Sequence, residues 1–308
     1  MEAVCGRATL GKESFADNQD DCCALPDQKG LWTFAIADGL GSHPHSQEAA
    51  GAAMDAIIHA VRTGKLGEWD IYQLIDETRR TVVNNAQIFY GESGKPVPDS
   101  GEYSTTLILG IEQPDSVMFA WLGNGAILHV HGSALLSTDN KPVPWQSANL
   151  MRPHIVENAE GKDALTKYLT GSADSQDFVP SVIEISLDND GAGDVFVICS
   201  DGILSAEDKK IGRVSNGGYW LQIDEMEVQL YALLHAITAA PEDITADLIT
   251  AKADSYLAGL RSAGLQHDDS TVVIFFSGRF LEARQRRIAE QQPKDAPAPS
   301  GSTNPWQR

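Results

Sequence analysis

The sequence predicts an α+β fold in which two antiparallel β-sheets pack as a sandwich flanked by helical hairpins. Three observations lead to this prediction. The chain contains many short runs rich in β-branched and aromatic residues, several of these runs are separated by hairpin-length turns, and two pairs of amphipathic segments lie between blocks of them. Two helical hairpins that each present one apolar face can cover the two outer faces of a sandwich.

Seven segments have the composition of β-strands, which favour side chains that fit a pleated, half-buried surface. They span residues 31–38, 104–111, 116–123, 126–132, 181–187, 194–201 and 271–276.

Four segments show apolar residues at helical spacing, and Ser46 is a candidate N-cap for the first of them. The first pair covers residues 46–61 and about 69–89, and the second covers 226–237 and about 241–260.

No linker composition interrupts residues 1–280, so we expect one domain there. Within it, the weak periodicity from Pro142 to Val179 predicts a mobile flap or an irregular insertion. Residues 281–308 lose apolar periodicity and gain Pro, Gln and Ser, which predicts a disordered C-terminal tail.

Composition limits the partners of the protein. A formal net charge of -20 disfavours nucleic acid and anionic membranes, and the sequence lacks a membrane-spanning run and a signal-peptide pattern. A cytoplasmic monomer is therefore expected. The four cysteines have no CxxC spacing, which predicts reduced, mostly buried thiols and neither a zinc site nor a disulfide framework.

Acidic residues follow a common local pattern, in which an aspartate ends an apolar strand or stands in the turn beside it. The four positions are Asp20, Asp38, Asp201 and Asp268. Strand ends of a sandwich converge on one rim, so these side chains can meet there. Two of them precede glycine, and Asp-Gly is also a common turn, so the simpler interpretation stays open.

Carboxylates gathered at one rim repel each other unless cations neutralise them. Hard oxygen donors favour Mg²⁺ or Mn²⁺, and two such ions about 3.5–4 Å apart can support an in-line phosphoryl displacement. GxSxG, HExxH and GxxxxGK[ST] motifs are absent from the sequence. The pattern therefore favours metal-assisted chemistry without a side-chain nucleophile.

Six short motifs occur in a fixed order: NQD at 18–20, ADGLGSH at 37–43, STT at 104–106, WLGNG at 121–125, CSDG at 199–202 and DDSTVV at 268–273. In this order and at these separations the chain resembles the type 2C, metal-dependent (PPM) serine/threonine protein phosphatases, particularly their bacterial branch. The resemblance spans roughly residues 5–277. It implies a β-sandwich flanked by helices and hydrolysis of phosphoserine or phosphothreonine by a metal-bridged hydroxide, with a kinase or its targets as substrates.

The resemblance also implies a ligand set for two Mn²⁺ or Mg²⁺ ions. Asp38 would bridge both ions and contribute to catalysis, and the carbonyl of Gly39 would bind one of them. Asp201, also counted as catalytic, and Asp268 would complete the ligands of the first ion. Asp20 would hold the second ion directly or through water.

Further positions carry over as supporting groups. Gln19 lies beside the second ion, Thr105 and Thr106 correspond to buried structural threonines, and Asp269 stands where Asn is common, outside the direct ligands. His43 in the metal loop suits protonation of the leaving alkoxide, although exposed loop histidines are usually inert and water can serve instead.

Two departures from the family pattern stand out. Phe15 occupies the position of a phosphate-gripping Arg, so Lys12 or Arg7 would have to orient the substrate. Asn124 replaces a carboxylate associated with a third metal, so the resemblance supports two ions and not a third. Asn-Gly is also a good type I′ hairpin turn, which alone explains its presence.

Two other functions stay open. Phe15 and Asn124 are compatible with a phosphatase-like binding module without turnover. A pair of carboxylates in a sandwich also occurs in glycoside hydrolases, which work in chelator, but no sugar-binding aromatic cluster accompanies the aspartates. The cluster of Arg284, Arg286 and Arg287 is interpreted as a solvated helix end or docking point.

Overall fold

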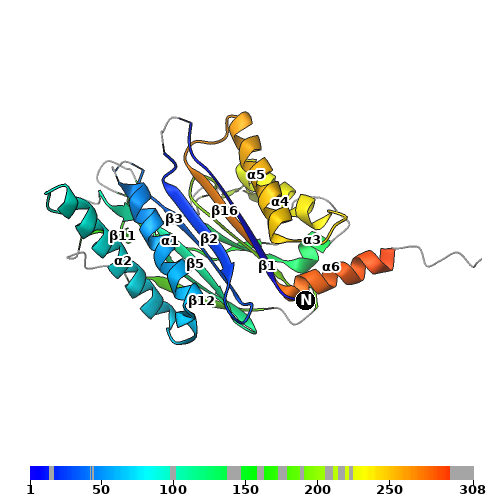
Figure 1. Ribbon diagram of the computed structural model, residues 1–308. Coiled ribbons are helices and arrows are strands. Elements are labelled where there is room, and N and C mark those ends of the chain that lie inside the picture. The colour runs from blue at the N-terminus through cyan, green and yellow to red at the C-terminus, as the bar shows by residue number, and fades with distance from the viewer. Residues whose placement is uncertain are drawn as a thin grey trace, which may run out of the picture.

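The computed structural model describes residues 1–13, 17–41, 43, 45–97, 102–136, 147–157, 163–172, 179–187, 191–204, 211–213, 219–221 and 225–291. Within them, two five-stranded antiparallel sheets stack face to face, with helices on both outer faces (Figure 1). The predicted α+β sandwich is confirmed.

The first sheet has the strand order β1-β16-β13-β7-β8. Its strands are β1 (Val4–Leu10), β16 (Ser270–Phe276), β13 (Asp194–Cys199), β7 (Ala126–His131) and β8 (Ser147–Asn149). The second sheet has the order β12-β6-β5-β3-β2. Its strands are β12 (Ser181–Ser186), β6 (Ser116–Leu122), β5 (Leu107–Glu112), β3 (Trp32–Asp38) and β2 (Asp20–Pro26).

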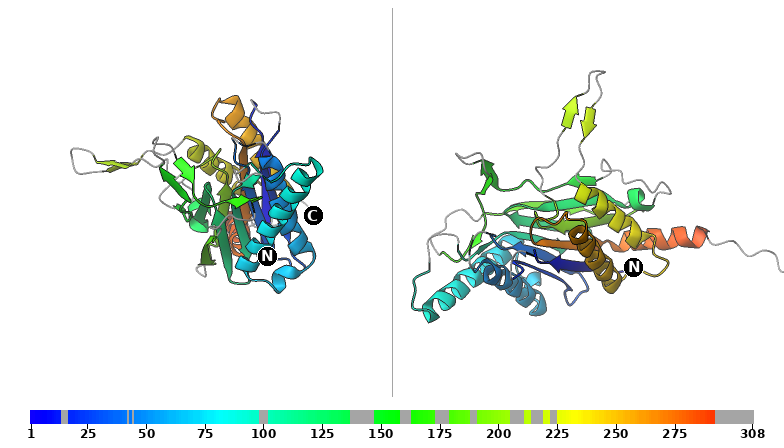
Figure 2. Two further views of the ribbon diagram at one scale, coloured as in Figure 1. Left: turned by 90° about the vertical axis from the view of Figure 1, so that its left-hand side faces the viewer. Right: turned by 90° about the horizontal axis from the view of Figure 1, so that it is seen from above.

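Three short strand pairs complete the β-structure. They are β4 (Ser104–Thr105) with β11 (Leu169–Thr170), β9 (Ile155–Glu157) with β10 (Asp163–Leu165), and β14 (Ile211–Arg213) with β15 (Tyr219–Leu221). Figure 2 shows the β14–β15 pair projecting from the body of the molecule. The segment from Pro142 to Val179, which was predicted to be irregular, contains the short strands β8, β9, β10 and β11 in its described parts.

The helices form the two outer layers and the C-terminal extension. They are α1 (Ser46–Arg62), α2 (Ile71–Glu92), α3 (Gly132–Leu136), α4 (Glu225–Thr238), α5 (Ala246–Ser262) and α6 (Gly278–Gln291), with a short 3-10 turn at Lys65–Gly67. The α1–α2 hairpin covers the second sheet, whereas α4 and α5 cover the first (Figure 1). None of the described helices is long and apolar enough to cross a membrane.

An aromatic layer fills the space between the two sheets. The ring of Phe34 in β3 stacks on Phe275 in β16 at 5.3 Å, and Phe119 in β6 contacts Phe196 in β13 at 5.2 Å. All residues of β13 and β16 are buried because each strand packs against this layer on one face and helices on the other. Their continuous apolar runs follow from this two-sided burial.

Several sequence expectations are confirmed and others are wrong. The seven predicted strands and four predicted helices all form, and the four cysteines are free and buried. Strands β1 and β2 were not predicted, because Gly6, Arg7 and the paired aspartates interrupt their apolar residues. Ser46 is not an N-cap: the helix begins at Ser46, His45 takes the cap position, and the Ser46 hydroxyl donates to the His43 carbonyl.

The C-terminal boundary also differs from the prediction, because α6 continues to Gln291 where a disordered tail was expected from residue 281. Its buried residues include Phe280, Leu281 and Arg284. The Arg284 guanidinium donates to the backbone carbonyls of Thr238, Ala240 and Glu242, which fastens α6 to the end of α4. Arg284 is thus a structural residue, not a docking point, and residues 292–308 lie outside the described ones.

We expect Arg284→Ala to lower the free energy of unfolding by about 2–4 kcal/mol, because it leaves one buried and two partly buried carbonyl groups without this donor. Urea unfolding measures this as a lower midpoint at an unchanged slope. Arg286→Ala is the control: its guanidinium donates to the exposed Gly191 carbonyl, so the expected change is within about 0.5 kcal/mol. Equal losses in both variants would contradict the assignment.

Candidate metal centre

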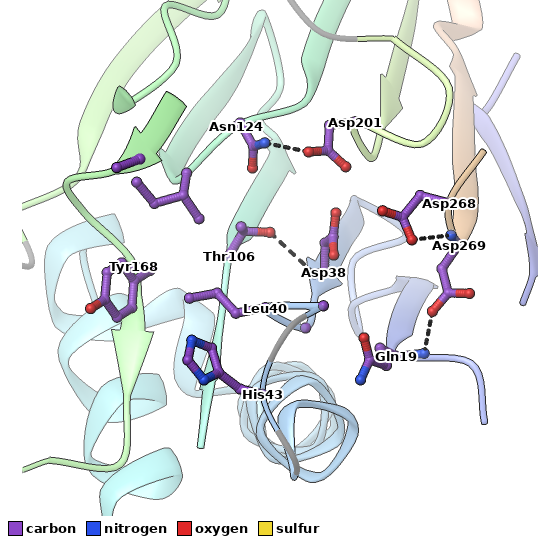
Figure 3. A pocket seen from close by; sticks show the side chains of 14 residues that line it. Gln19, Asp38, Leu40, His43, Thr106, Asn124, Tyr168, Asp201, Asp268 and Asp269 are labelled. Atoms are coloured by element: carbon purple, nitrogen blue, oxygen red, sulfur yellow. Dashed lines mark hydrogen bonds between the residues drawn. The ribbon is translucent and has the colours of Figure 1, made fainter. Parts of the chain in front are cut away.

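A pocket of about 390 Å³ opens at one rim of the sandwich. Carboxylates from three strand ends line one side of it: Asp38 ends β3, Asp201 follows β13, and Asp268 and Asp269 precede β16 (Figure 3). No lysine or arginine of the described residues lines this pocket. The structure thus brings together acidic groups that are far apart in the sequence, as the strand-end pattern predicted.

The backbone of Asp38 is held by the two threonines of the STT motif. Its N–H donates to Thr106 Oγ1 at 3.1 Å, and its carbonyl accepts from the Thr106 N–H at 2.8 Å and from Thr105 Oγ1 at 3.0 Å. These bonds satisfy the peptide and leave the carboxylate free to point into the pocket (Figure 3). Both threonines therefore position Asp38 through its main chain.

Asp20 lies directly opposite Asp38 in the β2–β3 pair and is not among the residues that line the pocket. Both carboxylate oxygens of Asp20 are buried without a hydrogen-bond partner. Burial raises the pKa of Asp20 to about 7, and the charge of Asp269 adds to the rise. Burial also raises the pKa of Asp38 well above its usual range, and the neighbouring charges of Asp20 and Asp201 raise it further.

Asp269 is 3% exposed, and its carboxylate accepts hydrogen bonds from backbone N–H groups. Its Oδ1 accepts from the Lys12 N–H at 2.6 Å and its Oδ2 accepts from the Gln19 N–H at 2.7 Å. The side chain therefore joins the start of β16 to both ends of the loop before β2. This arrangement agrees with its interpretation as a residue outside the direct ligands.

Asp201 forms a hydrogen bond with Asn124, whose side-chain amide donates to Asp201 Oδ2 (Figure 3). Asn124 stands between Gly123 and Gly125, which have φ values of 110° and 111°. Strands β6 and β7 belong to different sheets, so this turn crosses between the sheets. The type I′ hairpin interpretation is wrong, and sequence reasoning missed the contact because it depends on the sheet topology.

The glycines of the two Asp-Gly pairs are explained by close packing. Neither Gly39 nor Gly202 has a left-handed φ. A Cβ on Gly202 would lie 1.9 Å from the Asp269 carbonyl oxygen, and one on Gly39 would lie 2.8 Å from the Gln19 carbonyl oxygen. The simple turn interpretation is wrong for Asp38-Gly39, because Gly39 forms a β-bridge with Thr105, whereas Asp201 and Gly202 do lie in a turn closed by the Ile203 N–H and the Ser200 carbonyl at 3.1 Å. In both pairs the glycine also allows two acidic segments to approach each other.

The acidic side of the pocket supplies oxygen donors alone, which suits Mg²⁺ or Mn²⁺. As the side chains stand, no three His, Cys, Asp or Glu groups of the described residues are close enough to hold one ion. A bound cation would nevertheless interact with the unpartnered oxygens of Asp20. It would also reduce the repulsion between Asp38 and its neighbours Asp20 and Asp201. The donors fit hard divalent ions in chemistry, and ion binding requires the carboxylates to draw together.

A family model described as Protein phosphatase 2C matches residues 10–214, more than half of the chain. The chain belongs to the protein phosphatase 2C family. Such enzymes are phosphoprotein phosphatases. No curated protein matches the sequence.

Solved structures with the same fold include bacterial serine/threonine phosphatases. Stp1 from Staphylococcus aureus is 14% identical, with a TM-score of 0.55 over 88% of this chain and 94% of that one. The S. agalactiae phosphatase is 17% identical, with a TM-score of 0.53 over 89% and 99%. The Mycobacterium tuberculosis phosphatase PstP/Ppp is 16% identical, with a TM-score of 0.51 over 89% and 98%. At these identities the likeness establishes the fold.

Arg7 and Lys12, the two candidates for binding the substrate phosphate in this protein phosphatase 2C chain, have different surroundings. Arg7 donates to the carbonyl and the Sγ atom of Cys22 and does not line the pocket, so it is not available to the substrate. Lys12 lies at the edge of the site, with its Nζ 3.7 Å from Asp268 Oδ1. Phe15 lies outside the described residues.

The two histidines of the metal loop also differ from each other. His43 lines the pocket on the side away from Asp268, whereas His45 stacks on Phe89 at 4.4 Å and takes a left-handed φ of 73°. Of the two, His43 is the one that can reach a bound substrate. Leu40 and Tyr168 also line the pocket, and no sequence motif singled them out.

We expect Gly202→Ala to lower the free energy of unfolding by about 1–3 kcal/mol, because its Cβ cannot fit beside the Asp269 carbonyl. Gly51→Ala is the matched control: it lies within α1 with no atom near its Cβ, so the change should stabilise the chain by about 0.5–1 kcal/mol. Urea unfolding measures both. A change in the free energy of unfolding with the same sign in both variants would contradict close packing at Gly202.

A second prediction concerns Asp20, whose pKa is about 7 in the folded chain and about 3.9 in an unfolded one. Between these values the folded state binds more protons, so in chelator the stability falls as the pH rises from about 4 to about 7. We expect Asp20→Asn to reduce this loss, with the remainder due to Asp38, and Mn²⁺ to raise the melting temperature of the wild type more than that of the variant. Thermal unfolding at pH 4 and pH 8 tests both points, and identical profiles for the two chains would refute them.

Proposed function

We propose that this chain is a metal-dependent protein phosphatase that hydrolyses phosphoserine and phosphothreonine in partner proteins with two Mn²⁺ or Mg²⁺ ions. The observation that carries the proposal is the Asp20–Asp38 pair, in which Asp20 is buried with both carboxylate oxygens unpartnered and Asp38 lines an acidic pocket. Such a pair is stable at neutral pH only if protons or cations offset the repulsion. The family match makes cations the better explanation.

In the proposed site, Asp38, Asp201 and Asp268 would hold the ions together with the Gly39 carbonyl, and Asp20 would act on the second ion. When bound, such ions activate a water nucleophile and stabilise the charges of an in-line displacement. Thr105 and Thr106 fix the peptide of Asp38. These assignments follow the resemblance and the shared pocket.

Other residues of the chain would serve the substrate. Lys12, at the edge of the pocket beside Asp268, is in reach of a phosphate oxygen and would orient it in place of the family arginine. His43, on the opposite side, would protonate the leaving serine or threonine oxygen. A cytoplasmic location and a kinase or its targets as partners complete the proposal.

The experiment is hydrolysis of p-nitrophenyl phosphate and of a phosphothreonine peptide in Mn²⁺ or Mg²⁺. We expect turnover that chelator abolishes, and we expect Asp38→Ala and Asp201→Ala each to lower kcat by at least about 100-fold, because both remove charge from the reacting centre. Asp115→Ala is the control, since this side chain is 89% exposed and pairs with Arg279. No turnover by the wild type with either metal, or full turnover by Asp38→Ala, would contradict the proposal.

A second candidate is a phosphatase-like module that binds phosphoprotein without turnover. The Asn124–Asp201 hydrogen bond favours it, because an amide occupies one oxygen of a proposed metal ligand. Calorimetry with Mn²⁺ separates the candidates when combined with the turnover assay. Binding of two ions with turnover supports the enzyme, whereas weak binding of metal without turnover supports the module.

A further inference from the structure

The pocket wall that faces the carboxylates is mostly apolar. Figure 3 shows Leu40 from the metal loop and Tyr168 on the side of the pocket away from Asp268, together with the imidazole of His43. Ala164 and Leu165 from β10 also line the pocket, and Leu40, Ala164, Leu165 and Tyr168 are all half-buried. One cavity therefore presents carboxylates on one side and a mostly apolar surface on the other.

Backbone hydrogen bonds hold this apolar wall in place. Strand β10 pairs with β9, and the Thr166 N–H that follows it donates to the His154 carbonyl at 2.8 Å. Strand β11 follows immediately, and its Leu169 pairs with Thr105 in β4. Tyr168 thus lies between the Thr166–His154 hydrogen bond and the β11–β4 pairing. In that pairing, the Thr105 hydroxyl also donates to the Asp38 carbonyl.

The apolar surface continues outside the pocket along the same segment. Val156 lies opposite Ala164 in the β9–β10 pair, so the two side chains share one face, and Val156 is 53% exposed. Val179 is 58% exposed, and its carbonyl accepts from Lys167 Nζ at 3.0 Å. Exposed apolar side chains that continue a pocket lining are typical of binding surfaces.

The composition of this wall restricts what it can bind. No lysine or arginine of the described residues lines the pocket, and the ions of the proposed function would offset the charge of the aspartates opposite. A charged or polar residue beside the substrate phosphate would lose hydration on the wall without gaining a partner, whereas an apolar one would gain burial.

We propose that Val156, Ala164 and Tyr168 form a subsite for an apolar side chain within two residues of the phosphorylated serine or threonine. This inference rests on the proposed function and names its substrate class: phosphopeptides with aliphatic flanks are preferred over polar ones, and acidic flanks are rejected. The phosphate faces the carboxylate side of the cavity, and the neighbouring side chain packs on the opposite wall.

The test uses the full chain in Mn²⁺ and three phosphothreonine peptides that differ only in the two residues on each side, which are Leu, Asn or Asp. We expect kcat/KM to fall in that order, with at least a roughly tenfold preference for Leu over Asn, as one apolar side chain in a hydrophobic pocket supports. The preference should reside in KM, because these contacts form on binding and do not change during the reaction.

Variants locate the preference on the wall. We expect Val156→Asn and Tyr168→Asn each to reduce the Leu-over-Asn ratio by about threefold or more. Ile288→Asn is the matched control, a β-branched side chain 36% exposed on α6, which begins after the end of β16 remote from Asp268. It should leave the ratio and the basal activity unchanged.

Failure of this inference is distinct from failure of the proposed function. Equal kcat/KM for the Leu and Asn peptides, or an unchanged ratio in both wall variants, overturns the subsite while the phosphatase stands. If no peptide is hydrolysed, the proposed function fails, and fluorescence anisotropy with fluorescein-labelled peptides still measures the subsite. Tighter Kd for the Leu peptide then supports the wall, and equal Kd values overturn it.

Discussion

The constraint that shapes this site is the close approach of two carboxylates, Asp20 and Asp38, which repel each other across the β2–β3 pair. Asp20 and Asp38 face each other across this strand pair, and Asp201 is close enough to raise the pKa of Asp38 further. The hydrogen bonds in the region satisfy backbone groups of Asp38 and leave both oxygens of Asp20 without a partner. A fold that keeps such a pair at neutral pH has a use for cations there. This constraint connects the packing of the sandwich to the metal-dependent hydrolysis that we propose.

The sandwich topology accounts for how these groups meet. Strands β3 and β13 end at one rim, and β16 begins there, so each sheet contributes acidic residues to the same pocket. The close approach of these segments depends on Gly202, which leaves room for the Asp269 carbonyl. The turn between β6 and β7 passes from one sheet to the other and brings Asn124 to Asp201. In this chain an amide therefore stands beside the acidic centre.

Much of the fold could be predicted because local patterns and burial agreed. Strands such as β13 and β16 are buried on both faces, so their sequences are continuous apolar runs, and α1 presents one apolar face to a sheet. Strands β1 and β2 lack such runs, and α6 has a polar sequence that is anchored by the buried contacts of Arg284. In these elements, contacts with distant residues decide the structure, and a local pattern cannot reveal them.

The sequence by itself determined the type of fold and the acidic residues that gather at its rim, because strand composition and strand-end aspartates are local features. The tertiary structure alone decided that Asp20 is buried opposite Asp38, that Arg7 turns to Cys22, and that Tyr168 lines the pocket opposite the carboxylates. Each of these depends on which strands pair across a sheet or between sheets. Pairing joins residues far apart in the chain, so its outcome is set by the packing of the whole molecule.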